Sequence, residues 1–271
     1  MEFNSDRYAD LVYHDHASTD FGIAVKKPWI PIHPTPDETK THVPGRNGDV
    51  WQTNNAFQNV TETFECVVIR DPNLYSDWFE VRDAISDWLG VGQGYDYLEF
   101  TAYPNWAFYA EAQPFTLTPT ENDDFQATLS LPFDCSPMMT SIRGLDYKKL
   151  PESGVIINQT DFDIHPEWHI HGSGDFMLVI NGVNYFFDDV ENDIWLKSDG
   201  NAFEKDDQGI ESLVNSKIRL ANNDSPVFSC GKNTVSFQVP TFAEDGSLSK
   251  TITVHPADAF CEYKAMWKKV I

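Results

Sequence analysis

Apolar and polar positions alternate in several short segments of the chain, which is the pattern of a β-strand with one buried face. In the segment 61–69, Phe64, Cys66 and Val68 stand at alternate positions between polar or smaller residues. Further strand patterns in the first half lie at 21–25, 98–101, 106–110 and 125–131. The chain is therefore predicted to be mainly β.

One segment has the period of a helix instead. Between Tyr75 and Leu89, apolar residues recur at spacings of three and four, among them Val81 and Ile85, and Gly90 supplies a stop signal. The pattern predicts an amphipathic helix that covers a sheet, so the first half should be a β-sandwich or sheet with one covering α-helix.

An arm and a turn interrupt the strand patterns. The segment 31–44 carries four prolines and few large apolar residues, which predicts a loop or extended arm. Pro44 fixes its φ near −65°, and Gly45 can take the positive φ of a type II turn, while Asn47-Gly48 suits a second reversal. We expect a rigid turn from which Arg46 projects. The candidate turn and oligomer motif consists of Val43, Pro44, Gly45, Arg46, Asn47 and Gly48.

The second half has strand signals of its own. The segment 175–187 reads as two strands around Asn181-Gly182, a strong hairpin signal. The segments 235–239 and 251–254 form another predicted pair, and further strands are expected near 168–170 and 216–218. These predict an antiparallel sandwich.

The composition changes between the two halves. From Ser136 to Gly154 the chain contains Pro137, Gly144 and Pro151, so we place a boundary there. The predicted organisation is a first domain at 1–137, a linker at 138–152 and a second domain at 153–271.

The charge balance excludes one class of function. Nineteen basic against 42 acidic side chains give a net charge of −23, which disfavours binding to nucleic acid through its phosphates but permits a surface past which DNA slides. No run of 18 apolar residues and no secretion signal occurs, so we expect a soluble protein made in the cytosol, without membrane insertion. The four cysteines form no Cys-x-x-Cys pair and are expected to be buried reduced thiols.

Two histidine groups raise the question of a metal. His165, His169 and His171 lie within seven residues, and His14 and His16 form a second His-x-His. No carboxylate or thiol at a matching spacing completes either set, so we predict no metal and no cofactor. The acidic segment 188–193 lacks the calcium-loop pattern and is expected to be a solvated loop.

Catalytic signatures are absent from the sequence. There is no Gly-x-Ser-x-Gly elbow, no phosphate-binding Gly-x-x-x-x-Gly-Lys loop and no His-Glu-x-x-His, and carboxylate pairs are too numerous to discriminate. We predict that the protein is not an enzyme and has no catalytic residues. The aromatic residues Tyr103, Trp106 and Tyr109, with Tyr95 and Tyr97, either form a platform for a sugar or partner or pack in the core.

Several motifs in order resemble one known family. Val43–Gly48 is similar to a Val-Pro-Gly-Arg-Asp-Gly turn, with Asn47 in place of the aspartate. The other matching segments are 18–23, 131–137, 172–175, 180–182 and 231–234. Together, along essentially the whole chain, they resemble the distal tail protein (Dit) family of siphophages, the long, flexible-tailed bacteriophages. The C-terminal end around His255-Pro256 departs from the family's arginine-containing finish.

The resemblance implies a structural component of the tail tip or baseplate in the virion, synthesised in the host cytoplasm. It implies an N-terminal domain that forms a ring, usually a hexamer, between the tail tube protein and the tail-tip hub, with a central channel for DNA. It further implies a galectin-like C-terminal β-sandwich and a possible receptor-binding protein as partner. In such a ring, we expect Arg46 to pair with a carboxylate or with backbone carbonyls of its own subunit or a neighbour.

An alternative function remains open at this stage. A carbohydrate-binding module would contact the host cell wall through the C-terminal sandwich. Sugar binding by the second domain would distinguish this alternative from a ring-forming scaffold.

Overall fold

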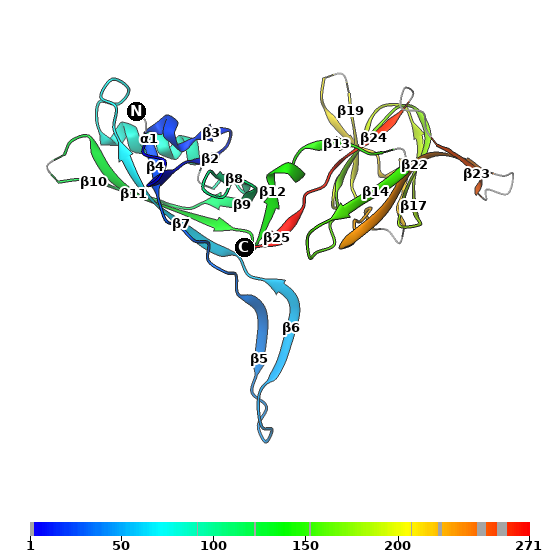
Figure 1. Cartoon of the computed structure of the whole chain (residues 1–271), viewed down its shortest axis with the longest axis horizontal. Helices are drawn as coiled ribbons and strands as arrows, with labels where there is room; N and C mark the ends of the chain where they lie inside the picture. The colour runs from blue at the N-terminus through cyan, green and yellow to red at the C-terminus, as the bar shows by residue number, and fades with distance from the viewer. Residues whose placement is uncertain are drawn as a thin grey trace. The chain divides into compact units, whose positions relative to one another are not determined.

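The computed structural model describes residues 3–90, 92–121, 123–151, 153–206, 208–221, 224–242, 248–253 and 259–271. The chain divides into two compact units, one of Met1–Thr140 with Val270–Ile271 and one of Ser141–Lys269. Each unit has its own buried hydrophobic cluster. The prediction of a mainly β protein is confirmed (Figure 1).

The first unit is built on an eleven-stranded sheet. Its main order is β1-β4-β7-β11-β9-β8-β2-β3, while β10 pairs with β11, and β12 pairs with β9 and β25. The strands are β1 (Tyr8–Ala9), β2 (Leu11–Tyr13), β3 (His16–Ala17), β4 (Ile23–Lys26), β7 (Val60–Ile69), β8 (Asp96–Phe100), β9 (Trp106–Ala112), β10 (Thr116–Pro119), β11 (Gln126–Cys135), β12 (Met138–Ser141) and β25 (Lys268–Val270). The strand expected at 21–25 begins only at Ile23, because η1 (Ser18–Phe21) precedes it and ends at Gly22, whose φ is 69°.

The alternation in β7 places its apolar side chains in the core as expected. Phe64, Cys66 and Val68 are fully buried, and in the antiparallel register with β11 Phe64 lies opposite Leu131 and Cys66 opposite Leu129. Side chains of one face are thus buried along both long strands, which makes β7 and β11 the centre of the first core.

The predicted covering helix is α1 (Trp78–Leu89). It begins where the Asp77 side chain accepts hydrogen bonds from the backbone N–H groups of Phe79 and Glu80, three residues later than the apolar period alone suggested. It ends at Gly90, whose φ of 51° lies in the left-handed region. Val81 and Ile85 are buried against the sheet.

A separate two-stranded hairpin belongs to the first unit. It consists of β5 (Pro36–Thr41) and β6 (Val50–Phe57), and it extends from the sheet just before β7 (Figure 1). The proline-rich arm of the sequence is therefore partly a strand.

The second unit is a sandwich of two antiparallel six-stranded sheets. The first sheet has the order β13-β24-β15-β18-β19-β20, and the second β14-β22-β16-β17-β21 with β23 beside β22. The first contains β13 (Tyr147–Lys149), β15 (Glu167–His171), β18 (Ile194–Leu196), β19 (Ala202–Lys205), β20 (Glu211–Leu213) and β24 (Phe260–Lys264). The second contains β14 (Ser153–Asn158), β16 (Gly174–Ile180), β17 (Val183–Val190), β21 (Ile218–Arg219), β22 (Gly231–Phe242) and β23 (Leu248–Thr253).

Side chains of both sheets share the second core. Trp168 and Cys261 of the first sheet and Leu178 and Phe237 of the second belong to one buried cluster. The antiparallel sandwich expected from the sequence is therefore confirmed, whereas its galectin-like character stays a prediction. No helix in the described ranges is long and apolar enough to cross a membrane.

Two local expectations in the second unit need correction. The strand expected near 216–218 is β21, which pairs with β17 and begins only at Ile218. The 3-10 helix η3 (Asn215–Lys217), whose Asn215 side chain accepts a hydrogen bond from Ala202 N, precedes it. Cys230 is exposed, unlike the other three cysteines, because it lies in the loop before β22. The second unit also contains η2 (Ile142–Gly144), which lies within the predicted linker at 138–152. Residues 243–247, between the predicted strands at 235–239 and 251–254, lie outside the described residues.

Candidate functional site

The turn motif lies at the tip of the β5–β6 hairpin. Val43 O accepts a hydrogen bond from Arg46 N at 3.2 Å around Pro44-Gly45, and Gly45 has a φ of 82°, the geometry of a type II turn. Gly48 also has a positive φ, at 81°. Two positive-φ glycines within four residues thus reverse the chain between the two strands.

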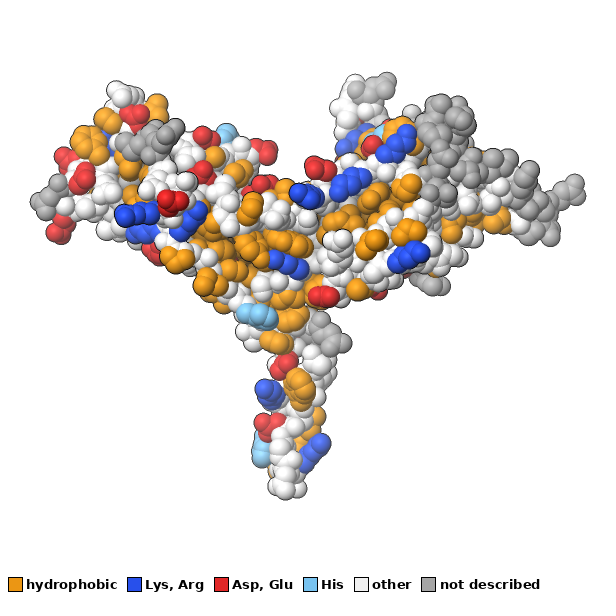
Figure 2. All heavy atoms as spheres, viewed as in Figure 1, with side chains coloured by type: hydrophobic (Ala, Val, Ile, Leu, Met, Phe, Trp, Pro, Cys, Tyr) orange, Lys and Arg blue, Asp and Glu red, His pale blue; other side chains and the backbone are white. Residues whose placement is uncertain are grey.

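The hairpin strands pair with each other and, within the described ranges, with no third strand. Glu38 lies opposite Thr53 and Thr41 opposite Val50, with a register shift near Pro36. Trp51 is 63% exposed, and apolar and charged side chains are interspersed along the hairpin (Figure 2). A two-stranded ribbon is only marginally stable alone in water. We therefore expect another surface to cover this hairpin.

Arg46 is exposed at the tip of this hairpin. Within the described part of the chain, its guanidinium makes no ion pair or hydrogen bond, while the neighbouring His42 and Asp49 approach each other at 3.3 Å. Among the described residues of its own subunit, Arg46 thus lacks the expected partner. Pairing with a neighbour stays a prediction.

The base of the arm is fixed by residues that the sequence reasoning missed. The Trp29 ring stacks on Phe64, with centroids 4.8 Å apart, and meets Phe100 and Phe108 edge-on. The buried Glu62 carboxylate accepts a hydrogen bond from Ile32 N at 2.7 Å. Burial raises the pKa of Glu62, and that hydrogen bond opposes the rise. The sequence contained two signals for this anchor. Trp29 stands beside Pro28, and Glu62 is a glutamate at one of the alternate, otherwise apolar positions of its strand.

The candidate aromatics do not form one platform. Tyr103 and Trp106 pack against the first core, whereas Tyr109 is 43% exposed and lies on the opposite face of β9 from Trp106. The Tyr109 ring lies 5.4 Å from that of Tyr95 and 5.3 Å from that of Tyr97, and Tyr95 donates a hydrogen bond to Asp134. The candidate aromatic group is therefore the exposed Tyr109 with the half-buried Tyr95 and Tyr97, without Tyr103 and Trp106. Residues an odd number of positions apart on a strand point to opposite faces, and this spacing was the sequence signal that separates Trp106 from Tyr109.

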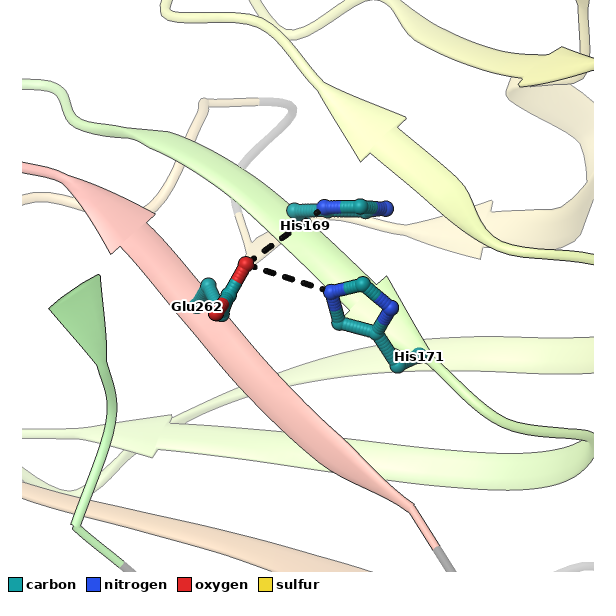
Figure 3. A group of neighbouring side chains, drawn as sticks. All are labelled: His169, His171 and Glu262. Atoms are coloured by element: carbon teal, nitrogen blue, oxygen red, sulfur yellow. Dashed lines mark hydrogen bonds and ion pairs between the residues drawn. The ribbon is translucent and has the colours of Figure 1, made fainter. Parts of the chain in front are cut away.

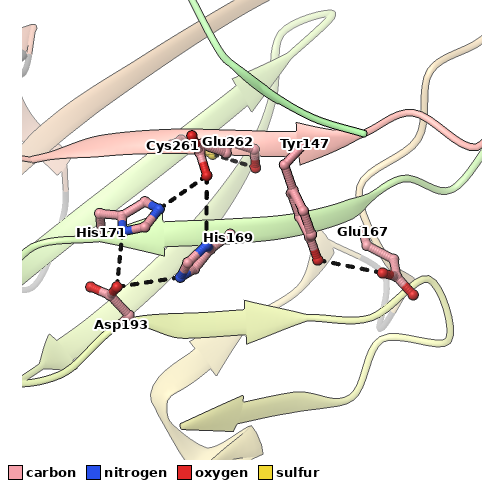
Figure 4. Close-up of polar contacts among 7 residues, drawn as sticks. All are labelled: Tyr147, Glu167, His169, His171, Asp193, Cys261 and Glu262. Atoms are coloured by element: carbon pink, nitrogen blue, oxygen red, sulfur yellow. Dashed lines mark hydrogen bonds and ion pairs between the residues drawn. The ribbon is translucent and has the colours of Figure 1, made fainter. Parts of the chain in front are cut away.

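One histidine group gathers partners that the sequence spacing did not indicate. His169 and His171 point to one side of β15, and Glu262 of the neighbouring β24 lies between them (Figure 3). Asp193, just before β18, contacts both rings on their other side (Figure 4). The expectation of a merely solvated loop at 188–193 was therefore wrong for Asp193, and also for Asp188, which lies in β17 and pairs with Arg219.

Aromatic contacts and burial define the environment of this cluster. Trp195 stacks on the His169 ring at 4.2 Å, and Phe260 stacks on the His171 ring at 4.1 Å. Burial lowers the pKa of His169, as does the nearby His171, while Asp193 and Glu262 act in the opposite direction. The His169 ring therefore favours its neutral form, the form that binds a metal.

The other histidines behave differently. His165 contacts Ser225, at 2.7 Å between Nδ1 and Oγ, and does not belong to the cluster. His14 contacts the Trp88 carbonyl, and His16 meets the ring of Phe21 edge-on. Neither belongs to a potential metal-ligand group in the described residues.

Solved structures resemble the whole chain. The Dit protein of phage SPP1, described as a paradigm of the hub adsorption apparatus in phages that infect Gram-positive bacteria, matches with a TM-score of 0.60 and 12% identity, over 97% of this chain and 99% of that one. The chain has a Dit-like fold. Two structures of the phage P2 baseplate in its activated conformation, with Ca and with Sr, match with TM-scores of 0.53 and 0.52, each at 10% identity over 98% of both chains.

The Dit-like fold, which short motifs of the sequence indicated, is found by comparison of structures and not by comparison of whole sequences. No protein-family model and no curated protein matches the chain. A fold depends on its burial pattern and strand pairing, and many different residues satisfy these at each position, so a fold persists at such low sequence identity. The agreement spans both units, in the same order along the chain.

Proposed function

We propose that this protein is a structural component of a bacteriophage tail tip or baseplate, in which copies of the first unit form a ring, with six as the expected number. The observation that carries the proposal is the Dit-like fold over 97% of this chain and 99% of the SPP1 protein. A match of this extent spans both units, not just a common sandwich.

The β5–β6 hairpin supports a ring with heterologous contacts. In such a ring one patch of a subunit meets a different patch of its neighbour, and a projecting arm supplies the first patch. The hairpin has exposed apolar side chains at its tip and strands, including Trp51, Val43 and Val50, and Ile30 at its base is 81% exposed. Covering these side chains with a neighbour stabilises both the arm and the ring.

Arg46 has a defined place in this arrangement. An exposed arginine at the tip, without a partner in the described part of its own chain, can bond to a carboxylate or to backbone carbonyls of the next subunit. The net charge of −23 supplies many carboxylates for this contact, and it also suits a ring whose central channel lets DNA pass without retention.

The proposal extends to the partners of the ring. We infer that it joins the tail tube protein to the tail-tip hub and the receptor-binding apparatus, and that the protein resides in the virion. This role requires no catalysis and no sequence-specific contact with nucleic acid.

Light scattering during gel filtration tests the ring. Six copies of the 30.8-kDa chain give a mass of about 185 kDa, which we expect at high protein concentration. Trp51→Ala and Arg46→Ala should each shift the distribution towards the monomer, and Leu213→Ala, which alters an equally exposed apolar residue of the second unit, should not. A strict monomer alone and with tail tube protein and hub present would contradict the proposal.

A further inference from the structure

Three side chains of the second unit bring metal-binding atoms together. Glu262 Oε2 lies 3.2 Å from His171 Nε2 and 3.7 Å from His169 Nδ1 (Figure 3). Zinc binds histidine nitrogen and carboxylate oxygen at about 2.0–2.1 Å, so neighbouring ligands of a tetrahedral site are about 3.3 Å apart. The spacing of these atoms fits a bound ion with only small side-chain movements.

We propose that His169, His171 and Glu262 bind a divalent transition-metal ion, with Zn²⁺ as the best match. Imidazole nitrogens favour zinc, copper and nickel over calcium and magnesium, which prefer all-oxygen sites. Three protein ligands leave the fourth tetrahedral position open to water or to a group from another molecule. The proposal rests on the second unit alone and is independent of ring formation.

Asp193 occupies the place of an outer carboxylate. Its Oδ2 lies 2.8 Å from His171 Nδ1 and 3.3 Å from His169 Nε2, the ring nitrogens that face away from Glu262 (Figure 4). Histidine ligands commonly donate their second N–H to a carboxylate, which fixes the tautomer and orients the ring. Asp193 can perform this role for both histidines at once.

One nitrogen of the cluster is buried and imperfectly satisfied. Within the described residues, His169 Nε2 has no aligned hydrogen-bond partner, although the Asp193 carboxylate is at 3.3 Å. A buried polar atom without an aligned partner is costly. A small rotation of the His169 ring on metal binding would align Nε2–H with Asp193 and bring Nδ1 closer to the position shared with Glu262.

The surroundings favour a cation at this place. Two carboxylates face two imidazoles, so with neutral histidines the cluster carries two negative charges, which a divalent ion balances. The rings of Trp195 and Phe260 stack on the histidines and restrict their movement, which lowers the entropic cost of binding.

Zinc titration of the full chain, freed of metal with a chelator, tests the site. A chromophoric chelator competes with the protein for Zn²⁺ and reports the affinity. Excess Mg²⁺ suppresses weak binding of Zn²⁺ to the many surface carboxylates. We expect one equivalent of Zn²⁺ per chain with submicromolar affinity. Glu262→Gln, which keeps the side-chain shape, should weaken binding at least about 100-fold, and Asp193→Asn about 10- to 100-fold. His165→Ala, a histidine of the same unit outside the cluster, should bind as the unaltered protein does.

Cobalt provides a second measurement that does not depend on affinity. Co²⁺ bound at the site should show the visible absorption of tetrahedral coordination, and Glu262→Gln should lose it. If Glu262→Gln does not fold, as judged by circular dichroism, His171→Asn replaces it. Absence of a saturable equivalent, or equal affinity in the unaltered and Glu262→Gln proteins, would overturn the site and leave only a proton-shared network of two histidines and two carboxylates.

Discussion

Replacing Gly45 and Gly48 by alanine tests whether the turn at the hairpin tip holds β5 and β6 in register. Both glycines have a φ near the left-handed region, 82° and 81°, and an added Cβ at either would meet no atom within 4 Å. The cost is therefore conformational rather than steric. It amounts to about 1 kcal/mol for each substitution after the smaller entropy of the unfolded alanine chain is subtracted.

The two substitutions together should cost about 2 kcal/mol, which increases the opening equilibrium of the hairpin roughly 30-fold. Since β5 and β6 pair only with each other in the described ranges, the opening is local and leaves the main sheet intact. Amide hydrogen exchange with mass spectrometry measures it. Peptides from 36–57 should exchange roughly 30-fold faster, and those from β7 should be unchanged.

A matched control separates the turn from glycine replacement in general. Gly209 has a φ of 79° and equally open surroundings, but it lies in the second unit, so Gly209→Ala should leave hairpin exchange unchanged. Equal acceleration in the hairpin and in β7 would refute the reasoning. So would hairpin amides that exchange without protection in the unaltered protein, because the turn would then hold nothing in register.

Three further predictions concern the units themselves. Asp77→Ala removes the cap of α1 and should lower the free energy of unfolding by about 1 kcal/mol in urea titrations, whereas Asp83→Ala on the same helix should change it little. Burial raises the pKa of Glu62, so stability is lost as pH rises through the raised pKa. Glu62→Gln should therefore stabilise the protein at pH 7 and cease to do so below pH 4, and equal effects at both pH values would contradict this. Cys230 should react with a thiol reagent in the native protein while the buried cysteines, whose pKa values burial raises, react only after unfolding; rapid reaction of two or more thiols would count against it.

Some parts of this protein follow from local sequence. The turn at Pro44-Gly45 and the hairpin at Asn181-Gly182, where φ is 52° and 81°, depend on backbone preferences of two residues each. Apolar residues at every second position were similarly sufficient to place β7, and apolar residues at helical spacing followed by Gly90 were sufficient to place α1. The sandwich in the second unit followed from such local signals because adjacent antiparallel strands need only short connections.

The candidate sites were only partly accessible in this way. Arg46 could be placed at a turn tip, but whether it finds a partner in its own chain depended on what surrounds the tip. Trp29 anchors the arm through contacts with strands that follow it, and Glu62 of β7 accepts a hydrogen bond from the earlier Ile32 N. No local pattern specifies which distant residue a side chain will meet.

The sequence by itself determined that the chain is a mainly β protein with one covering helix, a rigid turn and a later sandwich, because periodicity and turn chemistry act over a few residues. Only the tertiary structure decided the histidine cluster. His171 and Glu262 are 91 residues apart, and the pairing of β15 with β24 brings them to 3.2 Å, while the turn before β18 adds Asp193. The packing of the buried faces sets the strand register, and this register decides which side chains lie together on the opposite face, the histidine cluster among them.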